Sequence, residues 1–424
     1  MITSLRPYIR LVSDNTDFRR LWLSQIVSNF GDWFGLLAVY ALVTRFSDSE
    51  FLLGLVIIIK TLSLAVSSPL AGYITDRFNR RHLMIGCDLL RFVVVLGFLL
   101  IRSGGLLWLA YLLLMLQMFL SAIFLPARSS SIPNVTSSEE LVTANILSSL
   151  SWSMIFTMGM ALGGIATEFL GTDLVFIMDA ASYLLSAYFI YGAVIPQHQE
   201  TDTNGTAVHR QPLQGIMEGF LYLRRHATIR RPALAKGTFE IFQGALVYML
   251  ILVAERKLLM GSLGLGLLYA SRGLGTGVGP IVARRWFRDE NYWITLIGFL
   301  MMFSGGMYFF VGIWGSLIPI MIFVFFAHTA SGANWVMSTV LLQRRTPDPI
   351  RGRVFSLEWV YLTLAQSGSV ALASLLLDNQ WVTLDTAILL FAILLASTGI
   401  GWLSTIVKRE NKDKAEELRE MNLN

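Results

Sequence analysis

The chain has 424 residues, of which 54% are hydrophobic and only 14% are charged. Soluble domains carry about 25% charged residues, so this composition excludes an ordinary soluble protein and indicates a membrane protein. The net charge of +5 requires no nucleic acid, because anionic lipid of the inner leaflet is a sufficient partner for basic loops. The single cysteine, Cys87, excludes an internal disulfide.

Twelve apolar segments, each near the ~20 residues that a bilayer requires, predict twelve transmembrane helices and an all-α membrane protein. In chain order they cover residues 20–45, 51–76, 82–102, 105–127, 142–168, 173–194, 233–256, 262–286, 291–312, 315–342, 353–377 and 384–407. With the N-terminus inside, all but seven of the 33 lysines and arginines fall in predicted cytoplasmic segments. This asymmetry predicts that both termini are cytoplasmic.

The first segment carries an acid, Asp32, twelve residues after Arg20 and so roughly 18 Å further along a helix. A charge inside the hydrocarbon costs about 2.5 kcal/mol or more, which makes an intramembrane acid a candidate for function. We predict that Asp32 carries protons. The alternative is a packing acid that is paired with Lys60 or with a backbone group.

A glycine, an acid and a basic turn follow one another after the second segment, between Gly72 and Arg81. Gly72 would let two helices approach closely, and Asp76 can meet arginines or the N-terminus of a neighbouring helix. We predict a conformational latch formed by Gly72, Asp76, Arg77, Arg80 and Arg81. The alternative, an ordinary positive-inside turn, needs only the three arginines.

Two further acids lie in the third and sixth segments. Asp88 and Arg91 are three residues apart on one helix face, so we expect a local pair that supports the inner loop and belongs to the same latch. Asp179 lies six residues into the sixth segment, nearer the outside, and we expect it to have a structural role.

The polar stretch 196–232 divides the chain into a first six-helix half (1–195) and a second six-helix half (233–407), which is followed by a cytoplasmic tail (408–424). We expect this stretch to be a cytoplasmic linker. Around Leu213–Arg225 its pattern predicts an amphipathic helix on the membrane surface.

The second half repeats features of the first. Glu240 in the seventh segment corresponds to Asp32 and is the second proton-coupling candidate, although Lys236 or the arginines 230 and 231 could instead hold it. Arg272 in the eighth segment could pair with Glu240. Arg353 and Glu358 are the candidates for a matching inner latch. His328 is best explained as a packing histidine.

Aromatic residues in the first, seventh, eighth and tenth segments suggest a cavity for a greasy substrate. With the two intramembrane cations, the candidates for lining this cavity are Trp33, Lys60, Phe239, Tyr269, Arg272 and Trp335. Lipid-facing and interfacial positions are the alternative for any single aromatic residue.

Several segments carry a family resemblance: the 72–81 loop, Asp88-Leu89-Leu90-Arg91, Pro126-Ala127-Arg128, and the loop from Gln343 to Val354. With these segments the chain resembles the major facilitator superfamily, in particular the branch of bacterial macrolide efflux proteins and the enterobactin exporter. The resemblance implies two pseudo-symmetric six-helix bundles with a substrate site between them near mid-membrane. The chain departs from related drug antiporters at Met160, which stands where those proteins have a proline.

These features together predict a monomeric, multi-pass transporter of the bacterial inner membrane that exports amphipathic small molecules (drug, macrolide-like or siderophore-like) by proton antiport. A transporter of lysophospholipid or another lipid with the same fold is the alternative. We expect no enzymatic activity, cofactor or metal, since the sequence has no Gly-x4-Gly-Lys-Ser/Thr motif and no His-Glu-x-x-His motif. The substrate, direction and stoichiometry stay open.

Overall fold

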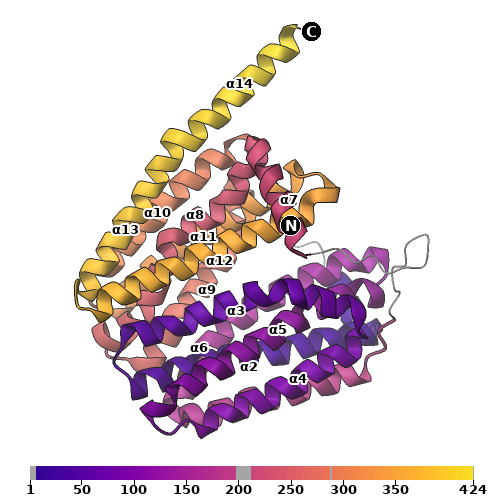
Figure 1. The fold of residues 1–424 in the computed structure, drawn as a ribbon, viewed down its shortest axis with the longest axis vertical. Helices are drawn as coiled ribbons and strands as arrows, with labels where there is room; N and C mark the ends of the chain where they lie inside the picture. Colours follow the sequence, from indigo (N-terminus) through magenta and orange to yellow (C-terminus); the bar gives the residue numbers. More distant parts are fainter. Residues whose placement is uncertain (1–5, 197–211, 287–288, 424) are drawn as a thin grey trace. The chain divides into compact units, whose positions relative to one another are not determined.

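The computed structural model describes residues 6–196, 212–286 and 289–423, and every regular element in these ranges is helical (Figure 1). The chain divides into two compact units. Unit one comprises residues 1–212 with 261–266, and unit two comprises 213–260 with 267–424. The all-α fold predicted from composition is therefore confirmed.

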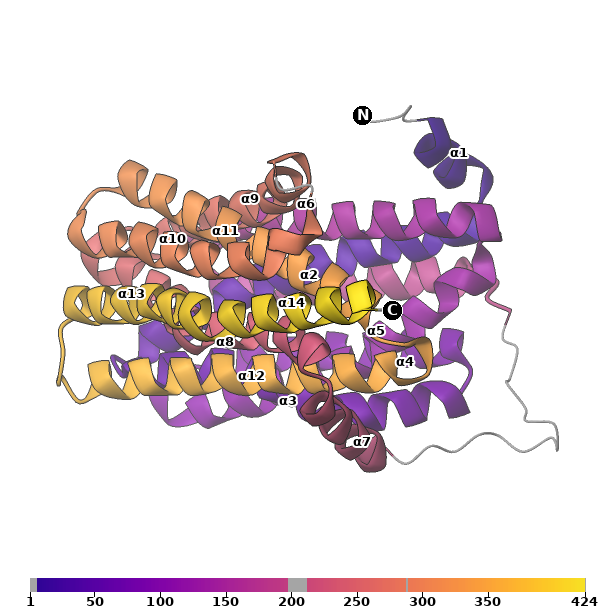
Figure 2. The same cartoon turned by 90° about the horizontal axis from the view of Figure 1, so that it is seen from above.

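Unit one is a bundle of long helices in which α2 packs along α6, α3 along α5, and α4 against both α5 and α6 (Figure 2). Its helices are α1 (Arg6–Asp14), α2 (Thr16–Phe46), α3 (Glu50–Arg77), α4 (Arg80–Gly97), α5 (Leu107–Val135) and α6 (Ser138–Gly192), with short 3-10 turns at Phe98–Leu100 and Gly104–Leu106. α6 is two helices joined at Gly171, where φ is +79°. Glycine tolerates this left-handed conformation, so the predicted fifth and sixth spans meet there without a loop.

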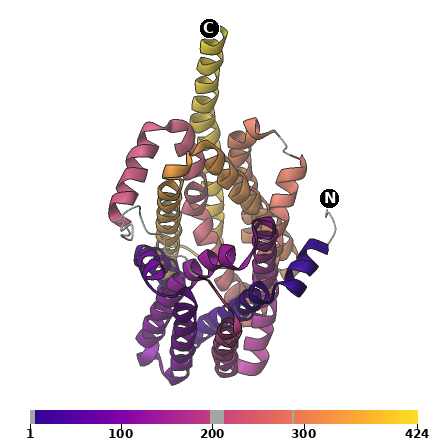
Figure 3. The ribbon, with the colours of Figure 1, turned by 90° about the vertical axis from the view of Figure 1, so that its right-hand side faces the viewer.

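Unit two is built around α8, which packs against α11, α12 and α13, while α10 packs between α11 and α13. Its helices are α7 (Pro212–Arg225), α8 (Ala227–Leu252), α9 (Gly261–Trp286, of which residues 267–286 belong to this unit), α10 (Trp293–Ile313), α11 (Leu317–Arg345), α12 (Asp348–Asp378), α13 (Leu384–Gly401) and α14 (Lys408–Leu423). Shorter turns occupy Val253–Lys257, Glu290–Tyr292 and Trp402–Val407. α14 continues from α13 and extends beyond the other helices of this unit (Figure 3).

Ten helices in the described ranges are long and apolar enough to cross a membrane. Dividing α6 at Gly171 and adding the 26-residue α9 accounts for the twelve predicted spans. The chain is thus a multi-pass membrane protein.

The polar linker is more helical than the sequence suggests. α7 coincides with the predicted amphipathic helix, and α8 begins at Ala227, six residues before the predicted seventh span. The early start has a physical cause, because Arg231 in the first turns of α8 forms a buried ion pair with Glu410 of α14 and a second, partly exposed one with Asp413. These pairs keep the charged turns helical. The tail after residue 407 also forms a helix that the sequence analysis did not predict.

α9 and α11 approach at backbone distance because glycines lie at their contact. A Cβ atom placed on Gly279 would lie 2.3 Å from the carbonyl oxygen of Thr329, and one on Gly332 would lie 2.3 Å from that of Thr276. Small residues that admit this approach are the usual means of packing transmembrane helices. Gly277, two residues before Gly279, has open space instead.

We expect Gly279→Ala to destabilise the protein, because its methyl group cannot be placed without moving α11. Overpacking of this kind typically costs about 1–3 kcal/mol. Gly277→Ala is the matched control, which should leave the melting temperature unchanged or raise it, since alanine is the better helix former by about 1 kcal/mol. Thermal unfolding of the two purified variants in detergent checks this; equal melting temperatures would contradict the packing described here.

Candidate functional site

The predicted proton carrier lies at the junction of three helices of unit one. Asp32 of α2 accepts a hydrogen bond of 2.6 Å from the hydroxyl of Tyr183 on α6. That hydroxyl in turn accepts one of 2.8 Å from Nε2 of Gln117 on α5. Both Tyr183 and Gln117 are buried. The carboxylate of Asp32 is therefore oriented by a chain of polar groups, as a group that exchanges protons requires.

A second carboxylate lies against the residues that flank Asp32. Asp179, only 1% exposed, is one helical turn before Tyr183 on α6. A Cβ on Gly35 would lie 2.1 Å from its Oδ2, and one on Gly31 would lie 2.6 Å from its Oδ1. The two glycines of α2 thus provide the space that Asp179 occupies, within electrostatic reach of Asp32.

The sequence analysis gave Asp179 a structural role, and the structure adds that its carboxylate lies against Gly31 and Gly35, which flank Asp32. Its Oδ1 is buried and has no hydrogen-bond partner in the described part of the chain. The signal that could have revealed this position is the Gly31-x3-Gly35 spacing around Asp32, which marks the face of α2 where another helix brings a large group close.

The ion pair predicted between Asp88 and Arg91 is present and completely buried. The Oγ of Ser186 donates to Oδ2 of Asp88 at 2.7 Å. The Arg91 guanidinium lies 4.4 Å from the ring centroids of both Tyr183 and Phe124. The pair is roughly 12–16 Å along α4 from its start at Arg80. It therefore joins the network around Tyr183 and does not brace the inner loop directly.

The arginines of the predicted latch bind backbone carbonyls within unit one. Arg80 donates to the carbonyl of Ser130 on α5 at 2.8 Å, and Arg81 donates to that of Tyr191 at the end of α6. Arg20 binds the carbonyl of Gly192, the last residue of α6. The final carbonyls of a helix lack intrahelical partners and attract cations, so Arg20 and Arg81 cap α6.

The latch itself stays a prediction. The backbone of Gly72, Asp76 and Arg77 belongs to α3, but Gly72 and Asp76 lie outside the residues whose surroundings the structure describes.

The cavity candidates of unit one form an aromatic group one residue from Asp32. The Nζ of Lys60 on α3 lies 4.6 Å from the ring centroid of Trp33 on α2. The Trp33 ring meets Phe156 and Trp152 of α6 edge-on, with centroids 4.6 and 6.2 Å apart. A cation over a tryptophan face is a favourable contact. The structure therefore brings together Trp33 and Lys60 as the sequence suggested, although α6 supplies the other rings.

In unit two Glu240, the second proton-coupling candidate, lies near Arg272, with which the sequence analysis considered a pairing. Glu240 of α8 interacts electrostatically with Arg272 of α9, whose guanidinium lies 5.3 Å from the ring of Tyr269. The Tyr269 hydroxyl donates to the carbonyl of Val247 on α8 at 3.3 Å. Phe239, beside Glu240, is buried. The candidates Glu240, Arg272 and Tyr269 thus lie near one another on two helices.

Lys236 does not hold Glu240, because it forms a buried ion pair of 3.0 Å with Glu358 of α12. Its Nζ also lies 4.4 Å from the ring centroid of Trp335 on α11. Arg353 instead pairs with Glu218 of α7. The two residues proposed for a second inner latch therefore have separate partners within unit two.

His328 is a satisfied packing residue, as expected. The Tyr308 hydroxyl lies 2.8 Å from its Nε2, and Nε2 of Gln243 lies 3.5 Å from its Nδ1. Ser304 donates to Oε1 of Gln243 at 2.9 Å. Nothing in the sequence pattern indicates this network, since its members are scattered polar residues in three apolar helices.

We expect Arg91→Met to be strongly destabilising, because it leaves the carboxylate of Asp88 buried without its cation. Breaking a buried ion pair from one side costs about 3–5 kcal/mol, whereas replacing both partners is far less costly. The double variant Asp88→Asn/Arg91→Met should therefore recover much of the lost melting temperature. A double variant as unstable as Arg91→Met alone would mean that the packing of Arg91 on the rings, and not the ion pair, stabilises unit one.

Comparison with known proteins shows to which family the chain belongs. Residues 11–422 match the family described as transmembrane secretion effector. The uncharacterized MFS-type transporter YfiS of Bacillus subtilis is 27% identical over 399 residues, covering 90% of this chain and 91% of YfiS. The putative bacilysin exporter BacE of Bacillus amyloliquefaciens is 24% identical over 403 residues, covering 95% and 98% of the two chains.

Solved structures share the fold at low identity. A peptide transporter POT variant in complex with sulfate superposes with a TM-score of 0.73 at 12% identity, over 93% of this chain and 95% of that one. A bacterial homolog of the human lysosomal transporter Spinster, inward-facing and unoccupied, gives 0.69 at 15% identity, over 95% and 96%. The predicted twelve-helix architecture is thereby confirmed, and the chain belongs to the transmembrane secretion effector family of major facilitator superfamily transporters.

Proposed function

We propose that this transporter exports amphipathic small molecules across the bacterial inner membrane and that inward movement of protons drives the export. The observation that carries the proposal is the acid cluster of unit one, in which Asp32 and Asp179 lie on facing helices and Tyr183 binds Asp32. An intramembrane acid is a functional residue by default, and this site contains two.

The chemistry follows from the arrangement of the charges. Arg91 forms a closed ion pair with Asp88, which also accepts a hydrogen bond from Ser186, while Asp32 and Asp179 lie within electrostatic reach of each other and of Arg91. Two carboxylates in one buried site repel when both are charged, and a bound proton relieves that repulsion. Loss of the proton would make the site receptive to a compensating positive group or to a change of helix packing.

Lys60 is a cation within electrostatic reach of Asp179, and its Nζ lies over the ring of Trp33. The aromatic group of Trp33, Trp152 and Phe156 offers an apolar wall with few polar anchors, which suits a bulky amphipathic compound. Export is supported by BacE, a relative named as a putative exporter of bacilysin, and by the resemblance to the macrolide and enterobactin exporters.

Glu240 with Arg272 is the corresponding acid and cation of unit two, and we propose it as the second coupling site. An acid that faces an arginine across two helices can exchange its cation for a proton, so protonation there would loosen α8 from α9.

We expect Asp32→Asn to abolish transport that depends on the proton gradient, because the amide cannot release a proton, while the hydrogen bond from Tyr183 keeps the protein folded. Proton-gradient-dependent accumulation of dye in inside-out vesicles, where export appears as uptake into the lumen, should fall at least tenfold. Asp173→Asn is the matched control, since Asp173 forms an exposed ion pair with Arg102. Wild-type efflux from Asp32→Asn would refute the proposal, and a lack of dye transport by the wild type would point to a lipid or another dedicated substrate.

Asp179→Asn should change the pH dependence of transport more than its maximal rate, because it removes the charge that acts on Asp32 but keeps the shape of the side chain. The measurement is efflux by wild type and variant across a series of external pH values. A purely structural Asp179 would instead lower the yield of folded protein and leave the pH profile of the remaining transport unaltered.

A further inference from the structure

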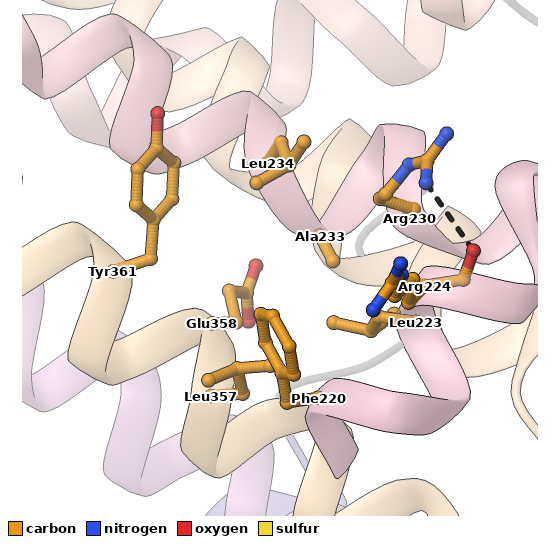
Figure 4. Close-up of a pocket in the computed structure, with 9 residues that line it drawn as sticks. All are labelled: Phe220, Leu223, Arg224, Arg230, Ala233, Leu234, Leu357, Glu358 and Tyr361. Atoms are coloured by element: carbon orange, nitrogen blue, oxygen red, sulfur yellow. Dashed lines mark hydrogen bonds between the residues drawn. The ribbon is translucent and has the colours of Figure 1, made fainter. Parts of the chain in front are cut away.

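A cavity of about 300 Å³ opens within unit two between α7, α8 and α12 (Figure 4). Most of its wall is apolar, formed by Phe220, Leu223, Ala233, Leu234 and Leu357. This volume is at the lower end of the ~300–1,000 Å³ typical of ligand pockets. Glu240 lies six residues beyond Leu234 on α8, but neither it nor Asp32 lines the cavity, and the proposed transport mechanism does not use the cavity.

Two arginines lie side by side at one end of the cavity, on the side away from Tyr361 (Figure 4). Nη1 of Arg230 donates to the backbone carbonyl of Arg224 at 3.4 Å, which holds the Arg230 guanidinium beside the last turn of α7. Neither guanidinium has a carboxylate partner among the residues that the structure describes. Arg231 and Arg353 of the same unit are, by contrast, both ion-paired.

The acid in the cavity wall does not cancel this charge. Glu358 is already neutralised by Lys236 at 3.0 Å, and both side chains are buried. The cavity therefore combines an apolar interior with two uncompensated cations at one end, which is the complement of an anion with an apolar tail.

The helix that closes the cavity has the character of an interfacial helix. The apolar side chains of Met217, Phe220 and Leu221 on α7 are 59%, 50% and 44% exposed. Arg224 and Arg225 follow on its last turn. A helix with exposed apolar residues and basic residues at one end lies at a membrane surface and attracts anionic lipid.

α7 is also fixed in place on α12. Glu218 pairs with Arg353, and a Cβ on Gly219 would lie 2.8 Å from the carbonyl oxygen of Arg353, so the two backbones touch. The cavity is thus a preformed feature between packed helices.

We propose that this cavity binds one anionic phospholipid of the surrounding membrane, with an acyl chain against Leu223, Leu234 and Leu357 and the phosphate on Arg224 and Arg230. The exposed apolar residues of α7 make the cavity continuous with lipid, which favours a membrane lipid over a free phosphate. The two unpaired guanidinium groups favour an anionic lipid over a neutral one. The bound lipid would link the helix of the linker to α8 and α12, and it need not be transported.

The test uses the full-length protein, purified in neutral detergent and depleted of lipid. Phosphatidylglycerol and phosphatidylcholine with identical acyl chains are titrated, and bound lipid is counted by native mass spectrometry. We expect tighter binding of phosphatidylglycerol, weakened roughly fivefold for each arginine removed in Arg224→Gln/Arg230→Gln. Arg225→Gln is the matched control on the same turn of α7, outside the cavity, and should stay within about twofold of wild type.

A second variant tests the acyl chain separately. Leu234→Trp fills the cavity and leaves both arginines in place, so it should also weaken phosphatidylglycerol binding, while inorganic phosphate at millimolar concentration should not compete. Equal binding of the two lipids, or unchanged binding by the double arginine variant, would overturn the proposal. Displacement of the lipid by inorganic phosphate, or unchanged binding by Leu234→Trp, would show an anion site without a place for the chain. None of these results depends on transport activity, so the test stands apart from the proposed export function.

Discussion

A charged side chain inside a membrane-spanning protein needs partners from the protein itself. The arrangement of unit one depends on the partners that enclose Arg91. The Arg91 guanidinium is enclosed by Asp88 and by the rings of Tyr183 and Phe124. Tyr183 is thereby fixed at the centre of the bundle, where its hydroxyl reaches Asp32. The same tyrosine joins the buried Asp88–Arg91 ion pair to the acid cluster that we propose exchanges a proton.

Glycines are the second constraint on the structure, because they determine how closely two helices, and the charged side chains on them, approach each other. Gly31 and Gly35 leave the space beside Asp32 that Asp179 fills, and Gly279 and Gly332 let α9 and α11 meet backbone to backbone. In the first case the space places two carboxylates together, which costs stability unless a proton is present. In the second it produces only tight packing. The two glycines of α2 thus admit a carboxylate from another helix, whereas the glycines on the facing helices α9 and α11 admit each other's backbone.

The sequence predicts well whatever depends on local pattern. Hydropathy identifies the spans, the three-residue spacing of Asp88 and Arg91 predicts their ion pair, and amphipathicity predicts α7. It predicts poorly what depends on which faces of distant helices meet. The approach of Asp179 to Asp32, and the pairing of Lys236 with Glu358, join residues about 150 and 120 positions apart, and no local period encodes such contacts. The helical start of α8 escapes prediction for the same reason, since its charged turn is stabilised by α14.

The central claim is that the acid cluster of unit one holds an exchangeable proton, and infrared difference spectroscopy tests it without knowledge of the substrate. A protonated carboxyl group has its own carbonyl stretch, which disappears when the proton leaves. Purified wild-type protein in detergent, stepped between mildly acidic and mildly alkaline buffer, should show such a band reversibly, and Asp32→Asn should lack it or show it shifted. A wild-type spectrum without a titrating carboxyl band, or an identical band in Asp32→Asn, would contradict the account.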